Sequence, residues 1–279
     1  MKQLVVTADD FGLAREVNEA VEEAHRNGIL TAASLMVAGA AAEDAVKRAR
    51  AMPSLRVGLH IVLVDGHPVL PAASLPDLVD ASGNFRDDMA SAGAAIFFRP
   101  NVRRQLEDEI EAQFEAYRAT GLPLDHVNTH KHFHLHPTIA DAIVRVGKRH
   151  GMRTMRLPLE PRRVLALAEP ETPIAPAYLT APFALLLRWR LRNQRIRIPD
   201  AVFGLAWSGA MHAARLRGLI GNLPQRLSEI YLHPASGGGF AGAAAGYRYA
   251  DELAALTDRS VAAAAGDAGI RLGGFSDFV

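Results

Sequence analysis

The sequence contains no cysteine, and this absence removes several classes of site at once. Without a thiol there is no disulfide framework, no thiolate zinc site and no cysteine nucleophile. A bound metal would have to be held by histidine, aspartate or glutamate. Neither sign of charge is in excess, because 31 Lys and Arg face 30 Asp and Glu, so we expect no nucleic-acid partner.

The chain also lacks a hydrophobic run of the roughly 20 residues that a membrane-spanning helix needs. Its first apolar run meets Asp9 too soon to form the apolar region of a signal peptide. We therefore expect a cytoplasmic protein. The 279 residues, of which 49% are hydrophobic, are enough for one α/β barrel or two small domains.

Strand-like apolar runs alternate with helical patterns along the chain. Strands are expected at 3–8, 31–37, 55–59, 125–129, 154–157 and 228–232, with a weaker one at 271–275. Such alternation predicts parallel βαβ units, and about seven strands fit a barrel better than an open sheet. Two proline-rich stretches, 64–100 and 159–200, interrupt the pattern. We expect one domain over 1–279 with long loop insertions at these two places.

The first predicted strand ends on two adjacent carboxylates, Asp9 and Asp10. Neighbouring residues of a strand point to opposite sides, so both carboxylates reach one site only if the strand ends there. In α/β sheets this rim is where ligands bind. A second interpretation is that one aspartate caps the helix that begins near Leu13.

Histidines end three further predicted strands, at His60, His130 and His233. Gly58 precedes His60 and would allow another backbone or a ligand to approach closely. Five of the 11 histidines fall between residues 126 and 137. An extended segment would place those at 130, 132, 134 and 136 on one side. Imidazole is the commonest neutral metal ligand near physiological pH, so this cluster indicates a metal site.

A carboxylate and two imidazoles leave open positions on a divalent ion, and the spare carboxylate can accept a proton from water. This set of groups suits hydrolysis of an amide or ester. The same ligands also fit a two-His-one-carboxylate Fe(II) oxygenase. A third hypothesis is a barrel that binds sugar or lipid without turnover, although both aspartates and all three histidines are present.

Several segments together resemble the YdjC-like carbohydrate deacetylases, a family that includes the chitooligosaccharide deacetylases. The matching segments are Thr7–Gly12, Gly58–His60, Asn128–His134 and Leu232–Pro234. They occur in the order typical of the family and span most of the chain. Thr31–Gly39 and His130–Pro137 further resemble the branch associated with hopanoid biosynthesis.

The resemblance implies a distorted TIM-type (β/α) barrel that holds one divalent ion, Mg or Zn. By family analogy, Asp10, His60 and His130 would be the metal ligands. Asp9 would be the general base and His233 the general acid. The neighbouring side chains that would contact substrate or orient these ligands are His132, His134 and Asn128.

The resemblance also implies an activity, since family members remove the acetyl group from N-acetylated amino sugars. The substrate implied by the hopanoid branch is an acetylglucosaminyl hopanoid lipid, which would yield free amine and acetate. The alternative substrates are soluble chitooligosaccharides.

Residues 183–198 form a basic amphipathic segment with five arginines, no acidic residue and one tryptophan. Such a segment can lie in the interface of an anionic bilayer, which would suit a lipid-linked substrate. It would place the protein peripherally at the inner membrane. Alternatively, the segment packs on the barrel with its arginines in solvent. Whether the protein forms a homo-oligomer is left open.

Overall fold

The computed structural model describes residues 1–171 and 175–278, with the side chains of 175–180 left aside. A parallel sheet forms its centre, in the order β4-β3-β2-β1-β6-β5, and β7 pairs with the start of β1. The strands are β1 (Gln3–Phe11), β2 (Ala32–Leu35), β3 (Arg56–Ile61), β4 (Val127–Thr129), β5 (Ala201–Phe203), β6 (Leu227–Leu232) and β7 (Arg271–Leu272).

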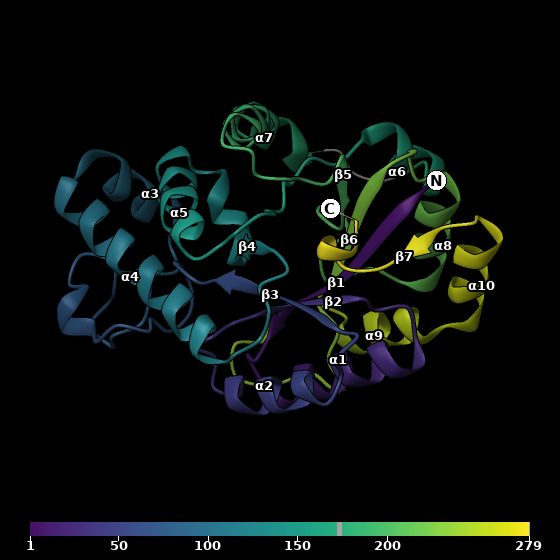
Figure 1. Ribbon diagram of the computed structural model, residues 1–279, viewed down its shortest axis with the longest axis horizontal. Coiled ribbons are helices and arrows are strands. Elements are labelled where there is room, and N and C mark those ends of the chain that lie inside the picture. Colours follow the sequence, from purple (N-terminus) through teal and green to yellow (C-terminus); the bar gives the residue numbers. More distant parts are fainter. Residues whose placement is uncertain (172–174, 279) are drawn as a thin grey trace.

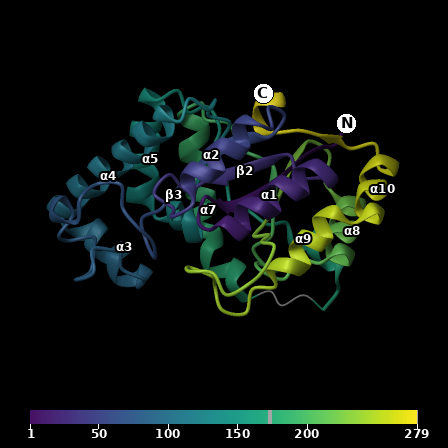
Figure 2. The same cartoon turned by 90° about the horizontal axis from the view of Figure 1, so that it is seen from below.

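Helices surround this sheet (Figure 1). They are α1 (Arg15–Asn27), α2 (Ala42–Arg50), α3 (Met89–Phe98), α4 (Pro100–Ala119), α5 (Pro137–Arg149), α6 (Arg162–Ala168), α7 (Ala175–Asn193), α8 (Ala213–Asn222), α9 (Tyr249–Thr257) and α10 (Arg259–Asp267). Short 3-10 turns are η1 (Ala72–Ser74), η2 (His130–Leu135) and η3 (Phe275–Asp277). Seen from below, α1, α2 and α9 lie in front of the strands (Figure 2).

The buried faces of these elements follow from their sequence patterns. The apolar side chains of β1 are fully buried, as expected for the central strand of a parallel sheet. Helix α1 buries Val17, Ala20, Val21 and Ala24, the helical spacing seen in the sequence. Among the described residues, no helix is long and apolar enough to cross a bilayer.

The segment that follows α5 completes the curvature of the sheet. The backbone of residues 154–156 hydrogen-bonds to Val127 of β4. On the other side, the Val202 amide of β5 donates to the Leu159 carbonyl. The two edges of the sheet are thus linked through irregular backbone, and the predicted distorted barrel of about seven parallel strands is confirmed.

Four expectations about individual elements need correction. Residues 154–157 form single bridges instead of a strand, at Thr154 and Met155. The stretch 64–100 contains η1 and α3, and 159–200 contains α6 and α7, so neither is a loop throughout. The sequence patterns also missed β5, because three residues are too few to show a period. The weak last strand is shorter than expected, with η3 following it.

Gly58 in β3 allows a close approach, as its place in the sequence predicted, and the group that approaches is His126. A Cβ atom at this position would lie 2.5 Å from the His126 carbonyl oxygen and 2.6 Å from the His126 ring. The His126 imidazole therefore packs directly on the β3 backbone, two residues before His60. This contact brings β3 and the segment before β4 into register.

We expect Gly58→Ala to lower the free energy of unfolding by about 1–3 kcal/mol, because the added methyl has no space beside His126. Urea denaturation at equilibrium measures the change. Gly221→Ala in α8 is the matched control, since a Cβ there meets nothing within 4 Å. That control should raise stability by about 0.5–1 kcal/mol through helix propensity. Equal effects of the two substitutions would contradict the packing argument.

Candidate active site

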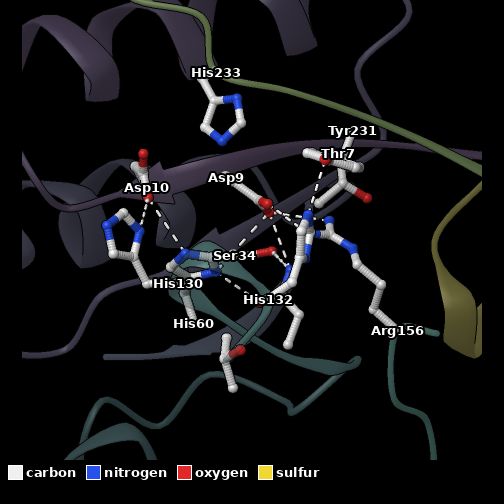
Figure 3. Close-up of polar contacts among 12 residues, drawn as sticks. Thr7, Asp9, Asp10, Ser34, His60, His130, His132, Arg156, Tyr231 and His233 are labelled. Atoms are coloured by element: carbon white, nitrogen blue, oxygen red, sulfur yellow. Dashed lines mark hydrogen bonds and ion pairs between the residues drawn. The ribbon is translucent and has the colours of Figure 1, made fainter. Parts of the chain in front are cut away.

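One cavity of about 880 Å³ opens at the carboxyl ends of the parallel strands. Five residues singled out from the sequence line it: Asp9, Asp10, His60, His130 and His233. They come from β1, from β3 and from the ends of β4 and β6. Because parallel strands deliver their carboxyl ends to the same rim, side chains far apart in the chain meet here (Figure 3).

Both aspartates face the same cavity, but the backbone geometry that allows this differs from the expected strand end. Strand β1 does not stop at Asp9 but continues to Phe11. Its register against β2 shifts between Ala8 and Phe11, and Asp10 adopts a left-handed φ of 63°. This bulge breaks the alternation of side chains, so that consecutive carboxylates face one space. The capping interpretation is wrong, because Ala14 is the N-cap of α1 and has no side-chain cap.

Asp10, His60 and His130 form a compact cluster. Each offers one possible ligand atom, and these atoms lie within 4.8 Å of one another. The Asp10 Oδ1 atom is 3.3 Å from His60 Nε2 and 3.2 Å from His130 Nδ1. Burial by itself raises the pKa of Asp10, but His130 and His60 lower it more, so its carboxyl is ionised well below its ordinary range.

Asn128 fixes which nitrogen of His60 faces Asp10. The Asn128 amide donates through Nδ2 to Asp9 Oδ1 at 3.0 Å, so its Oδ1 is the acceptor that faces His60. His60 Nδ1 lies 2.7 Å from that oxygen and must carry the proton. In the neutral imidazole, Nε2 is then the nitrogen without a proton, and it faces Asp10. In the described structure this buried nitrogen has no well-oriented hydrogen bond, as expected of a metal ligand.

The histidine cluster after β4 is not extended. Residues 130–135 form the 3-10 turn η2, and Lys131 and His132 both have a φ of 52°. The expectation that alternate histidines share one side is therefore wrong. His132 Nε2 instead contacts the Tyr231 hydroxyl at 2.8 Å, and His134 Nδ1 contacts Thr129 Oγ1 at 2.7 Å.

Burial keeps these two imidazoles neutral. It is the main cause that lowers the pKa of His132 well below its usual value, with the Arg156 charge next. The same two causes lower the pKa of His134 to about 3. Neither histidine is therefore suited to donate a proton near neutral pH.

Arg156 is a functional candidate that the sequence patterns missed. Its fully buried guanidinium donates to Asp9 at 2.5 and 3.0 Å, and to Glu229 Oε1 at 2.6 and 3.0 Å. It also lies 4.4 Å from the centre of the Tyr231 ring. Burial alone would raise the pKa of Asp9, but Arg156 and His60 lower it more, so Asp9 is firmly ionised.

A signal for Arg156 does exist in the sequence. Arg156 and Glu229 are opposite charges within two apolar, strand-like runs, 154–157 and 228–232. Charges in such positions are rarely left unpaired, because an isolated buried charge is costly. The pairing itself depends on which strands are neighbours, and the sequence does not give that.

His233 lies across the two carboxylates from His60 and His130 (Figure 3). Its ring centre is 5.7 Å from that of Tyr231 and 5.1 Å from that of Tyr247. Its backbone amide donates to Glu252 Oε2 at 2.5 Å, which holds the end of β6 in place. The buried Nδ1 atom makes no hydrogen bond within the described part of the chain.

Fold and site together define a parallel α/β barrel whose carboxyl rim carries a carboxylate–histidine cluster beside a second carboxylate. Residues 3–266 match the family described as "YdjC-like protein", and the chain belongs to that family. The family predicted from the sequence motifs is thereby confirmed.

Relatives of the chain carry the name carbohydrate deacetylase. One from Geobacillus stearothermophilus is 30% identical and aligns over 98% of this chain and 97% of its own. One from Mus musculus is 34% identical over 82% of this chain and 73% of the relative. For a third, from Brevibacillus brevis, the 38% identity extends over only 53% of this chain and 56% of that relative.

A solved structure from Enterococcus faecalis V583 superposes with a TM-score of 0.77 and covers 99% of this chain and 98% of its own. Its name gives it a proposed role in cellobiose-phosphate cleavage. At 22% identity, this likeness supports the fold alone.

We expect Arg156→Met to lower the free energy of unfolding by about 3–5 kcal/mol, because Asp9 and Glu229 would lose their buried counter-charge. Urea denaturation measures the loss. Arg145→Met is the matched control, since Arg145 pairs with Glu107 at the surface with 55% of its side chain exposed. That substitution should cost about 1 kcal/mol or less. Similar losses in both variants would refute a special role for the buried pair.

Proposed function

We propose that this protein is a metal-dependent N-deacetylase that hydrolyses the acetamide of an N-acetylated amino sugar to free amine and acetate. The observation that carries the proposal is the Asp10–His60–His130 cluster with the spare carboxylate of Asp9 beside it. The carbohydrate deacetylase names of the relatives support the substrate class. We further propose that residues 1–279 act as one catalytic domain.

The cluster fits a divalent ion by its chemistry. One carboxylate and two imidazoles are ligands that zinc accepts in catalytic sites, with a position left for water or substrate. Asp10, His60 and His130 would hold the ion, Zn or Mg. When bound, the ion supplies Lewis acidity that polarises the amide carbonyl and makes water more acidic.

Asp9 is the proposed general base. Arg156 and Asn128 orient its carboxylate, and the low pKa keeps it ionised and able to accept a proton. A carboxylate with so low a pKa is a weak base. Asp9 would therefore act on water made more acidic by an ion that Asp10, His60 and His130 would hold.

His233 is the proposed general acid. It faces the two carboxylates from the side opposite His60 and His130 (Figure 3). The leaving amine would lie on that side if the acetyl carbonyl approached Asp10. Tyr231 and Tyr247 flank the ring and limit its orientation. A proton on His233 would pass to the amine nitrogen as the carbon–nitrogen bond breaks.

Among the other histidines of the cluster, His132 lines the cavity, and we propose that it contacts substrate. His134 is fully buried and would act by holding Thr129. Asn128 would orient both His60 and Asp9.

We further propose a lipid-linked amino sugar as the substrate, as in the hopanoid-associated branch that the sequence motifs resemble. The lining of the cavity supports this idea. Beyond the polar cluster it is largely apolar, with Met89, Phe133, Leu135, Leu165 and Phe183 on its wall. An apolar wall would accept a hydrocarbon aglycone more readily than a second sugar ring.

The exposed side of α7 supports a membrane contact at residues 183–198. The helix buries Ala184, Leu187 and Leu191, which fix it on the protein. It leaves Leu185 46% and Trp189 62% exposed, beside several arginines. We propose that this side of α7 contacts anionic lipid on the cytoplasmic side of the inner membrane.

Acetate release tests the proposed activity. We expect purified protein to release acetate from acetylglucosaminyl hopanoid, and to release it faster than from chitooligosaccharides. Asp9→Asn should lower the rate by about 10²–10⁴-fold, because a general base contributes that much. Mass spectrometry of both products provides the measurement.

Anaerobic assay and chelation are the controls. A hydrolase keeps its rate without oxygen and loses it when the metal is removed. Oxygen-dependent turnover would instead favour the Fe(II) oxygenase alternative. A near-wild-type rate in Asp9→Asn would remove Asp9 from the scheme, and preference for chitooligosaccharides would overturn the lipid substrate.

Flotation with liposomes tests the membrane contact. We expect the protein to float with anionic vesicles at low salt and to remain at the bottom with neutral ones. Trp189→Ser should reduce the floating fraction several-fold, because an interfacial aromatic residue is lost. Phe98→Ser on α3 is the control, since Phe98 is 74% exposed on a different helix and should have no effect. Equal loss in both variants would contradict a contact through α7.

A further inference from the structure

A chain of buried hydrogen bonds leads away from the candidate metal cluster into the interior of the barrel. His126 Nδ1 lies 2.9 Å from Asp125 Oδ2, and His126 Nε2 lies 3.0 Å from Ser34 Oγ. Asn128 Nδ2 donates to the same Ser34 oxygen at 2.9 Å. Each of these side chains is buried, and Ser34 and Asn128 are fully so. The chain ends on His60 through Asn128 Oδ1.

The polarity of this chain follows from counting donors and acceptors. The Asp125 carboxylate only accepts, so a neutral His126 carries its proton on Nδ1 and presents a lone pair on Nε2. Ser34 therefore donates its hydroxyl proton to His126 and accepts from the Asn128 amide. With both Nδ2 protons used, on Ser34 and Asp9, the Asn128 oxygen faces His60. Every proton of the chain is thereby accounted for.

We propose that Ser34, His126 and Asp125 are positioning residues that hold His60 in the tautomer with its proton on Nδ1 and its Nε2 lone pair toward Asp10. The inference deepens the proposed function, because that lone pair is the one a metal ion would use. A flipped Asn128 would turn its oxygen toward the Asp9 carboxylate and lose the Ser34 bond. The chain thus disfavours the wrong tautomer of His60 from a distance.

The C-terminal segment anchors the far end of this series of hydrogen bonds, at Asp125. Asp125 accepts hydrogen bonds from the backbone amides of Phe275 at 3.2 Å and Ser276 at 2.8 Å. The His126 ring lies 4.8 Å from the Phe275 ring, centre to centre. These contacts restrain the carboxylate that fixes the tautomer of His126.

A serine, a histidine and an aspartate linked by hydrogen bonds could suggest that the serine is a nucleophile. The structure argues against that role. The Ser34 side chain is fully buried in β2, opposite the bulge of β1. It does not line the cavity that holds Asp9 and Asp10. A substrate carbonyl could not reach its hydroxyl, so positioning is the role that fits.

Ser34→Ala tests the proposal, with Ser228→Ala as the matched control. Both serines are fully buried in parallel strands, but the Ser228 hydroxyl has no hydrogen-bond partner among the described residues. We expect Ser34→Ala to weaken Zn²⁺ binding to the metal-free protein about tenfold, as outer-shell substitutions do. Ser228→Ala should leave the affinity unchanged. Calorimetric titration gives the affinities, and thermal melting verifies that both variants fold.

Nitrogen-15 NMR of the metal-free protein at alkaline pH provides a second measurement, independent of metal and turnover. The wild-type His60 ring should show the Nδ1–H tautomer, assigned by loss of its signals in His60→Gln. In Ser34→Ala the Nε2–H form should become populated. An unchanged tautomer together with unchanged Zn²⁺ affinity would overturn the proposal. If wild-type protein bound no Zn²⁺ while the tautomer still shifted, the proposed function would fail and the positioning chain would stand.

Discussion

Two adjacent carboxylates buried at the end of β1 are the constraint on which the rest of the site depends. Asp9 and Asp10 are 2% and 7% exposed. Two negative charges so close together, and so far from water, repel strongly unless neighbouring side chains compensate each of them. The structure gives them different partners. Asp9 faces Arg156, whereas Asp10 faces His60 and His130. The bulge of β1 makes the pair possible, and these partners make it stable.

The separate partners also separate the chemistry of the two aspartates. The Arg156 guanidinium is always protonated, so it keeps Asp9 ionised and holds its carboxylate in place. An imidazole can lose a proton and bind a metal ion instead. The cluster of Asp10, His60 and His130 can therefore hold either protons or a metal ion. A single sequence motif of two identical residues therefore has two different electrostatic environments, and the neighbouring side chains decide which aspartate has which.

Polar and apolar parts of the cavity have different origins in the fold. The polar groups come from the ends of parallel strands, whose positions the sheet fixes within narrow limits. The apolar wall comes largely from α3, η2, α6 and α7, which lie in or beside the long connections between strands. Such connections vary without disturbing the sheet. This division would let the same polar cluster be combined with differently shaped apolar walls.

The sequence by itself determined the strand–helix alternation, the family and the residues at the strand ends, because local periodicity and short motifs survive without tertiary contacts. It did not determine the bulge at Asp9 and Asp10, the turn that disperses the histidines after His130, or the pairing of Arg156 with Asp9. Those depend on which strands become neighbours, and residues 147 positions apart carry no local signal of contact. Tertiary structure alone decided how identical side chains were given different partners, since burial and counter-charge exist only in the folded chain.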